Sequence, residues 1–133
     1  MIIEDENLIV KKIIEAVFEG ALADERISII SATSTDTERV HRILQYDEGI
    51  DLIFCAISTE SNVAEILKFV SIARFAHSEP EKIIGISECS NYSESLRLAG
   101  CSLVYNRIEA CRYLAETLEF KKYQQLQETS VNA

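Results

Sequence analysis

Acidic and hydroxyl side chains follow the short apolar segments of this sequence. Glu4 and Asp5 come directly after the apolar residues 1–3, and Ser58 ends a long apolar run that begins at residue 49. Adjacent carboxylates can hold Mg²⁺, although one or two of them bind it weakly without a third ligand or a phosphate. A solvated acidic loop, whose charge favours the start of the following helix, is the alternative. A weak Mg²⁺ site at Glu4 and Asp5 therefore stays open.

The cysteines and histidines form no recognisable metal or catalytic pattern. The four cysteines contain no Cys-x-x-Cys pair, and the two histidines lack zinc-motif spacing. No Gly-x-Gly-x-x-Gly or Walker pattern follows the first apolar segment, which argues against a nucleotide. Neither Cys55 nor Cys89 has a histidine or lysine beside it that would activate its thiol. We therefore expect inert thiols, no resident cofactor and no enzymatic activity.

The composition is that of an acidic globular domain. The 133 residues suit one core, and 13 basic against 22 acidic residues give a formal net charge of -9. This charge argues against binding to nucleic acid or to anionic lipid. No apolar stretch reaches the roughly 18 residues of a membrane span, and no leader precedes the first apolar segment. We expect a cytoplasmic protein with one domain over 1–127 and a flexible tail over 128–133.

Five strands are predicted from apolar and β-branched segments, at residues 1–3, 26–32, 49–58, 82–87 and 102–105. The third segment is almost continuously apolar, which is typical of a central strand buried on both faces of a sheet. The second segment alternates between apolar and polar residues, which favours a place nearer the edge.

Five amphipathic helices are predicted between and after these strands. The first begins at Asn7 and ends near Gly20, the second has capping-box spacing at Thr35 and Glu38, and the third has Asn62 as its N-cap. The fourth stops at Gly100. The expected apolar faces include Ile9, Ile13, Ala16 and Val17 in the first helix, Val40, Ile43 and Leu44 in the second, and Ile108, Cys111, Ala115 and Leu118 in the last.

This alternation predicts an α/β fold, a three-layer doubly wound parallel sheet with right-handed crossovers and helices on both faces. A flavodoxin-like strand order of 2-1-3-4-5 would place the first and third strands side by side. Their carboxyl ends would then meet at the switch point of the topology, where such sheets bind ligands. We expect the functional site in that crevice.

In their order and spacing the residues resemble the receiver domain of bacterial two-component response regulators. Segment 2–6 resembles the first strand with its acidic pair, Glu4 and Asp5, and segment 49–56 resembles the third strand. Segment 83–87 resembles the fourth strand, and 99–104 resembles the approach to the fifth. The resemblance covers nearly the whole chain and implies a CheY-like fold.

The resemblance fails at the residues that carry the phosphorelay chemistry of the family. The aspartate that accepts the phosphoryl group aligns with Ala56, whose methyl group cannot attack phosphorus or coordinate a cation. Ser87 fits the hydroxyl that contacts the phosphoryl group, and capping of a turn is its alternative role. The small residue expected next is Glu88, which would repel a dianion. The resemblance therefore implies a degenerate phosphorylation site at Glu4, Asp5, Ala56, Ser87, Glu88 and Arg107.

Arg107 aligns with the phosphate-binding lysine of the family, and Ile108 replaces the proline that follows it. We hypothesise that Arg107 pairs permanently with Glu4, Asp5 or Glu88, because a guanidinium suits a stable carboxylate contact. An exposed arginine at a helix start is the alternative. The switch aromatic of the family aligns with Val104, one position before Tyr105.

These departures favour a pseudoreceiver, a signalling adaptor that binds a protein partner without phosphorylation. The resemblance places the partner-binding surface on the fourth helix, fifth strand and fifth helix, with Tyr92, Arg97, Tyr105, Arg112 and Tyr113. Phe120, Tyr123 and Leu126 on the last helix would support a homodimer or pack back on their own domain. An atypical receiver and a ligand or redox sensor that uses the crevice are the alternatives.

Overall fold

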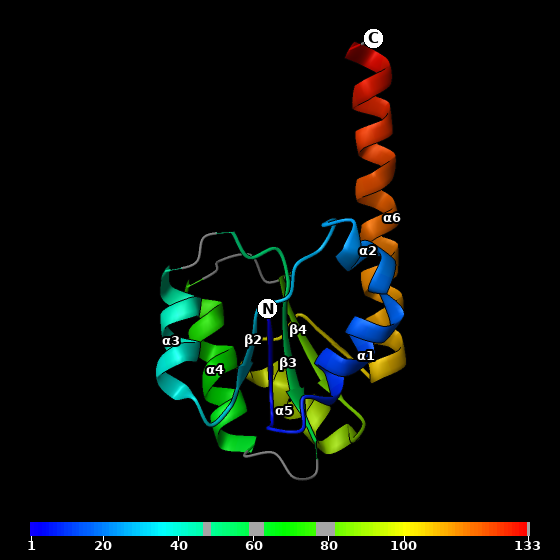
Figure 1. Ribbon diagram of the computed structural model, residues 1–133. Coiled ribbons are helices and arrows are strands. Elements are labelled where there is room, and N and C mark those ends of the chain that lie inside the picture. Colours follow the sequence, from blue (N-terminus) through cyan, green and yellow to red (C-terminus); the bar gives the residue numbers. More distant parts are fainter. Residues whose placement is uncertain (47–48, 59–62, 77–81, 133) are drawn as a thin grey trace.

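The chain forms a three-layer α/β domain of the flavodoxin-like kind, with helices on both faces of one sheet (Figure 1). The computed structural model describes residues 1–46, 49–58, 63–76 and 82–132, with side chains up to Glu119. The sheet has five strands, all parallel, in the order β2-β1-β3-β4-β5. The strands are β1 (Ile2–Glu4), β2 (Ser31–Thr33), β3 (Ile53–Ile57), β4 (Ile83–Ser87) and β5 (Leu103–Tyr105). The predicted fold class and strand order are confirmed.

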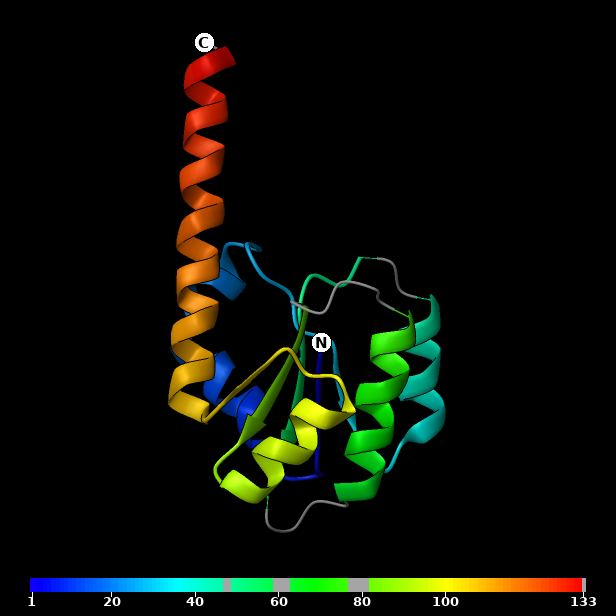
Figure 2. The ribbon, with the colours of Figure 1, turned by 180° about the vertical axis from the view of Figure 1, so that it is seen from behind.

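The described residues contain six helices: α1 (Ile9–Val17), α2 (Glu19–Ala23), α3 (Thr37–Tyr46), α4 (Val63–Ala76), α5 (Ser90–Ala99) and α6 (Arg107–Asn132). Helices α1 and α6 cover one face of the sheet, and α3, α4 and α5 cover the other, as the two opposite views show (Figures 1 and 2). No helix in the described part of the chain has the length and apolarity that a membrane span requires.

The central strand β3 sends alternate side chains into two separate hydrophobic clusters. Ile53, Cys55 and Ile57 pack among α3, α4 and α5, whereas Phe54 and Ala56 pack among α1 and α6. All five residues are buried. Because both faces are covered, the strand needs apolar residues at every position, and this requirement explains the continuous apolar run in the sequence.

Two predicted strands are longer than the structure allows, because neighbouring strands set their length. Segment 26–32 was expected to pair throughout, but only Ser31–Thr33 pairs with β1, since β1 itself is limited to Ile2–Glu4. Likewise β1 begins opposite Phe54 and β4 begins opposite Ile53, so residues 49–52 have no strand beside them. The residues left out of the sheet line a cavity at the amino ends of the strands.

The first predicted helix is wrong in its apolar face and in its end. Val10 and Ile14 are buried, whereas Ala16 and Val17 are exposed and Ile9 and Ile13 are only partly covered. The helix stops at Val17, and Gly20 lies inside α2 rather than at a C-cap. Helix α2 ends at Ala23, and Glu25, shortly after it, has a left-handed φ of 57°.

Glu25 occupies the position after the cap of α2 at which glycine is preferred. Its N–H donates to the Leu22 carbonyl at 3.1 Å, and the Arg26 N–H donates to the Ala21 carbonyl at 2.9 Å. These two bonds form a Schellman motif, which satisfies the last carbonyls of a helix. A glutamate pays a conformational cost there that a glycine would avoid.

The second predicted helix has the expected apolar stripe but a different N-cap. Val40 and Leu44 are buried, as predicted, and Ile43 packs against the same cluster. Asp36, not Thr35, supplies the cap, since its carboxylate accepts the Arg39 N–H at 3.3 Å. The hydroxyl of Thr35 instead donates to the Glu6 carboxylate at 3.3 Å.

Helices α4 and α5 each bury apolar residues against the sheet. Ile66, Val70 and Ala73 are buried in α4, with Phe69 as a further core residue, and Leu96 is buried in α5. The fourth predicted helix ends at Gly100, whose φ of 133° is a conformation that side-chain-bearing residues rarely adopt. The predicted N-cap Asn62 lies outside the described residues.

The last helix, α6, buries a different stripe from the predicted one. Ala110 and Leu114 are buried, while Ile108 is 71% exposed, and Cys111, Ala115 and Leu118 are only partly covered. Its backbone stays helical to Asn132, through most of the predicted tail, and it projects beyond the rest of the domain (Figures 1 and 2). The side chains of Phe120, Tyr123 and Leu126 are outside the described part.

Candidate functional site

The predicted site residues meet at the carboxyl ends of β1, β3 and β4. One small hollow is lined by all six positions of the predicted degenerate phosphorylation site: Glu4, Asp5, Ala56, Ser87, Glu88 and Arg107. Ser58, which follows β3, lines the same hollow. The strand order brings these residues together from positions far apart in the sequence, since β1 and β3 are neighbours.

Glu4 acts as the N-terminal cap of α1. Its two carboxylate oxygens accept the backbone N–H groups of Val10 and Lys11, each at 2.9 Å. These are the amides that a capping side chain normally satisfies, and Leu8, at the N-cap position, makes no side-chain cap bond. Glu4 is only 3% exposed, and burial raises the pKa of its carboxyl, against the two amide hydrogen bonds that lower it.

Asp5 is engaged on both of its carboxylate oxygens. Its Oδ1 accepts the backbone N–H of Asn7 at 2.9 Å, and its Oδ2 accepts a short hydrogen bond from the Ser58 hydroxyl. The Ser58 hydroxyl, which follows β3, therefore contacts Asp5, which follows the neighbouring strand β1. Sequence spacing does not predict this contact, because residues 5 and 58 become neighbours only through the sheet.

Ala56 lines the hollow, in the position that the resemblance assigns to a phosphoryl acceptor. It is 7% exposed and faces the α1 and α6 side of the sheet. Its methyl group has neither a lone pair nor an ionisable proton, so this position can neither act as a nucleophile nor bind a cation. The hollow therefore has an inert group at the position of the phosphoryl acceptor.

Ser87 uses its hydroxyl within its own turn. The Ser87 hydroxyl donates to the Cys89 carbonyl at 2.9 Å and accepts the Cys89 N–H at 3.0 Å. Ser87 is buried, and these two bonds tie the end of β4 to the start of α5. This is the turn-capping arrangement that we considered as the alternative to a phosphoryl contact.

Glu88 and Arg107 form the pair that was one of the three hypothesised. The Arg107 Nε lies 3.8 Å from Glu88 Oε1, and the same oxygen accepts the Arg107 backbone N–H at 2.9 Å. The two side chains are 36% and 54% exposed, so solvent screens the ion pair and it contributes little to stability. The backbone contact is the more consequential one, because it satisfies an amide in the first turn of α6.

A capping box starts α6 beside this pair. The Asn106 side-chain oxygen accepts the Glu109 N–H at 2.8 Å, and the Glu109 carboxylate accepts the Asn106 N–H at 3.0 Å. Sequence reasoning missed this motif, although the spacing of Asn106 and Glu109 is its signal. Glu88 and the box together fix the N-terminus of α6 at the edge of the hollow.

The hollow is nearly closed. Its volume is about 10 Å³, which is about the space that one water molecule needs. In the part of the chain with described side chains, no group of three or more histidine, cysteine or acidic side chains is arranged to hold a metal ion. Glu4 and Asp5 fit Mg²⁺ poorly, because the oxygens that would bind it already accept hydrogen bonds from the chain.

The thiols beneath the site are chemically protected. Burial raises the pKa of the Cys55 thiol well above its ordinary value, and it raises the pKa of Cys101 to about 12. Both side chains lie in the cluster under α3, α4 and α5. A thiol that is not ionised at neutral pH is a poor nucleophile and reacts slowly with oxidants, so neither residue suits a redox sensor.

The residues predicted to bind a partner are divided between the two faces of the sheet. Tyr105 and Tyr113 lie together, with ring centroids 5.6 Å apart and planes tilted by 44°. Both pack against the cluster under α1 and α6, and Arg112 is an exposed residue of α6. Tyr92 packs against the opposite cluster, and Arg97 is exposed on α5. These residues therefore flank the β5 edge rather than forming one flat patch.

In comparisons with known proteins, no protein-family model, curated protein or solved structure matches the chain. The class that the fold defines is a flavodoxin-like α/β domain. In its crevice, the side chains of Glu4, Asp5 and Ser87 form hydrogen bonds with other residues of the chain.

Proposed function

We propose that the protein is a pseudoreceiver, a phosphorylation-independent module that binds a protein partner through a constant surface and is not an enzyme. The observation that carries the proposal is the use of the crevice carboxylates. Glu4 caps α1 and Glu88 contacts the first turn of α6, so groups that would hold a metal or meet a phosphate instead hold helices in place. In a module of this kind, the former site stabilises the surface.

Three further observations support the absence of a phosphorylation switch. Ala56 offers no acceptor, the Ser87 hydroxyl is engaged in its own turn, and the hollow has room for about one water molecule. A phosphoryl group needs an acceptor, a counter-charge and space. Among the described residues that line the hollow, only Arg107 supplies a counter-charge, and its side chain already lies against Glu88.

Incubation of the full chain with acetyl phosphate and Mg²⁺, followed by intact-mass measurement, tests this part of the proposal. We expect no added phosphoryl mass. A stable adduct would contradict it, and peptide mapping would then show whether Ser58 had become the acceptor in an atypical receiver. An authentic receiver domain treated in parallel controls for the activity of the reagent.

The partner surface that we propose is centred on Tyr105, Tyr113 and Arg112, at the β5 edge. Tyrosine and arginine often dominate binding energy at interfaces, and the tilted tyrosine pair is held in place by the core beneath it. Quantitative affinity capture from the native cytoplasm, with wild type and an Arg112→Ala, Tyr113→Ala variant as baits, tests this surface. Tyr46→Ala is a matched control, because Tyr46 is 77% exposed on α3, across the sheet.

A protein whose recovery falls at least about tenfold with the paired variant but not with Tyr46→Ala would support the proposal. If every specifically captured protein were retained equally by the two variants, the β5 edge would not be the partner surface. Circular dichroism of each bait guards against loss caused by unfolding.

We also propose that α6 provides a contact with a second copy of the chain. The supporting observation is that its backbone continues as a helix to Asn132, beyond the rest of the domain (Figures 1 and 2). Isolated helices of this kind are marginal in water without packing. Light scattering on the full chain and on a chain ending at Glu119 tests this, and a monomer in both cases would contradict it.

A further inference from the structure

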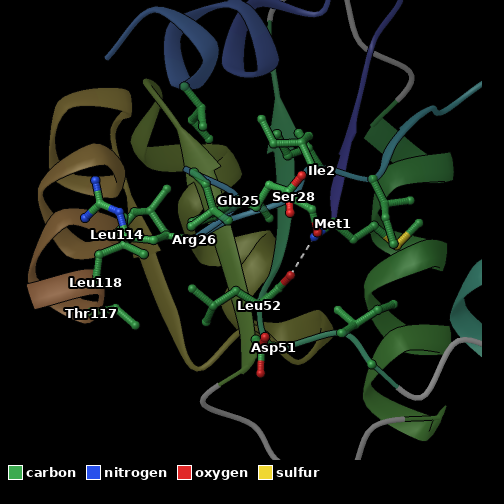
Figure 3. Close-up of a pocket in the computed structure, with 17 residues that line it drawn as sticks. Met1, Ile2, Glu25, Arg26, Ser28, Asp51, Leu52, Leu114, Thr117 and Leu118 are labelled. Carbon is green, nitrogen blue, oxygen red and sulfur yellow. Dashed lines mark hydrogen bonds between the residues drawn. The ribbon is translucent and has the colours of Figure 1, made fainter. Parts of the chain in front are cut away.

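A cavity lies at the amino ends of the strands, at the opposite edge of the sheet from the crevice (Figure 3). Its volume is about 220 Å³. It is bounded by the starts of β1 and β3, by α1 and α6, and by residues 25–30 after the α2 turn. Neither the receiver resemblance nor the proposed function uses it.

The cavity exists because segment 27–30 leaves the sheet. Ile30 still contacts β1, since its carbonyl accepts the Ile2 N–H at 2.8 Å. Before Ile30, no strand of the described chain pairs with the segment, which follows the Schellman turn at Glu25.

The floor of the cavity is apolar and its mouth is polar. Buried aliphatic and aromatic residues form the floor, namely Ile2, Ile14, Ile50, Phe54 and Leu114. The charged lining residues Glu25, Arg26 and Asp51 are all exposed, and Arg26 is paired with Asp24 at 3.6 Å. A charge on a ligand would therefore stay at the wet mouth, where ion pairs contribute little, so contact with the floor would supply most of the affinity.

We propose that this cavity binds a compact, uncharged, mainly apolar small molecule with a single hydrogen-bonding group that meets the mouth. An apolar cavity of about 150 Å³ is enough to hold benzene. The space in this protein therefore suits one substituted ring.

The ligand would also contact α6 just before the helix leaves the domain. Leu114, Thr117 and Leu118 line the cavity from α6, whereas Ile14 lines it from α1 (Figure 3). Occupation would bridge the helices and the sheet through contacts that the empty cavity lacks. This site is independent of the proposed partner surface and of the absence of phosphorylation, so its failure would leave the proposed function intact.

The test uses benzyl alcohol as the probe, with benzylamine and benzoate as charged compounds of similar ring size. Titrations of the isotope-labelled full chain are followed by amide chemical shifts. We expect saturable binding of benzyl alcohol with shifts at residues 27–30 and 114–118, and weaker binding of both ions. No saturable shift, shifts confined to other parts of the domain, or tighter binding of either ion would overturn the proposal.

Thr117→Phe fills the cavity and should weaken benzyl alcohol binding at least about tenfold. Thr117 is half-buried, and its hydroxyl donates only to the Tyr113 carbonyl of its own helix, at 2.9 Å. Ser71→Phe is the matched control. The Ser71 hydroxyl makes the same type of bond to the Leu67 carbonyl, at 3.2 Å, and Ser71 is an exposed residue of α4. Equal binding by wild type and Thr117→Phe would overturn the proposal, and the wild-type shift map decides it if Thr117→Phe does not fold.

Discussion

The two ends of the sheet differ in what occupies the space where strands begin or finish. At the carboxyl ends, Glu4, Asp5 and Ser87 satisfy amides and hydroxyls of the chain, and about 10 Å³ remains. At the amino ends, a cavity of about 220 Å³ has an apolar floor and a polar mouth. Doubly wound sheets usually bind ligands at the carboxyl ends of their strands. In this protein the larger of the two spaces lies at the amino ends instead.

This difference follows from how each end meets its helices. Polar residues at the carboxyl ends reach helix starts, whose free amides attract carboxylates, so α1 and α6 are held close to the crevice. The amino ends meet Leu114, Thr117 and Leu118 of α6 and the irregular segment 25–30 instead. Apolar side chains there have no directional bonds that draw the elements together, so space remains.

Ala56→Asp is the strongest way to break this comparison, because it places a carboxylate in the closed crevice. The position is 7% exposed and lies among the carboxylates of Glu4 and Asp5, which repel a new charge. We expect a loss of about 3–5 kcal/mol in the free energy of unfolding by urea denaturation at neutral pH. Ala56→Asn, of similar shape but uncharged, should lose clearly less.

The same Ala56→Asp protein should gain no phosphoryl mass from acetyl phosphate and Mg²⁺, since Ser87 and Arg107 stay engaged with Cys89 and Glu88. Phosphorylation of the substituted protein would mean that the crevice still works as a receiver site. The crevice would then be disarmed at a single position rather than rebuilt.

Glu4→Ala tests whether the acidic residue serves mainly as a helix cap. The change leaves the Val10 and Lys11 amides without their carboxylate partner and removes a buried side chain. We expect a loss of about 2–4 kcal/mol in the free energy of unfolding, together with reduced helicity. Glu4→Gln keeps one oxygen acceptor and should lose less. A loss below about 1 kcal/mol for Glu4→Ala would contradict the capping role.

The pH dependence of stability gives a second measure of Glu4. Burial raises the pKa of this carboxyl in the folded protein above its ordinary value of 4.5. The folded protein therefore binds the proton more tightly than the unfolded chain, and Glu4 makes stability fall as pH rises from the unfolded pKa through the folded one. The stability of wild type relative to Glu4→Gln should decrease over that window, and urea denaturation at several pH values measures it.

Glu25→Gly tests the opposite end of the sheet and should raise stability slightly. Glycine adopts the left-handed conformation of residue 25 without the steric cost of a side chain. We expect a gain of about 0.5–1 kcal/mol in the free energy of unfolding. Glu25→Ala is the control, because it removes the carboxylate but keeps the strain. Equal stability of the glycine and alanine variants would contradict this account.

Arg107→Gln should have the smallest effect. The ion pair with Glu88 is exposed, and the backbone bond from residue 107 to Glu88 survives the change. We expect a loss of no more than about 0.5 kcal/mol in the free energy of unfolding, and less in high salt. A loss above about 2 kcal/mol would mean that the guanidinium neutralises the buried Glu4 carboxylate as well.

Much of this protein was determined by local pattern. The continuous apolar run at 49–58 predicted a strand buried on both faces, and the alternation of segments predicted the sheet order, both of which are confirmed. The polar residues at the strand ends line one hollow, because parallel strands in this order place their carboxyl ends together. Alanine at position 56 is a fact of the sequence alone.

Tertiary structure decided which of two possible roles each polar residue has. Glu4 caps α1 from outside that helix, and Asp5 meets Ser58 across the sheet; these contacts depend on distances between elements that sequence spacing does not contain. The same holds for the apolar faces of α1 and α6. The predicted residues lie one position along the sequence from those that are buried. The cavity at the amino ends depends on how far two neighbouring strands extend, and only the packed sheet sets that length.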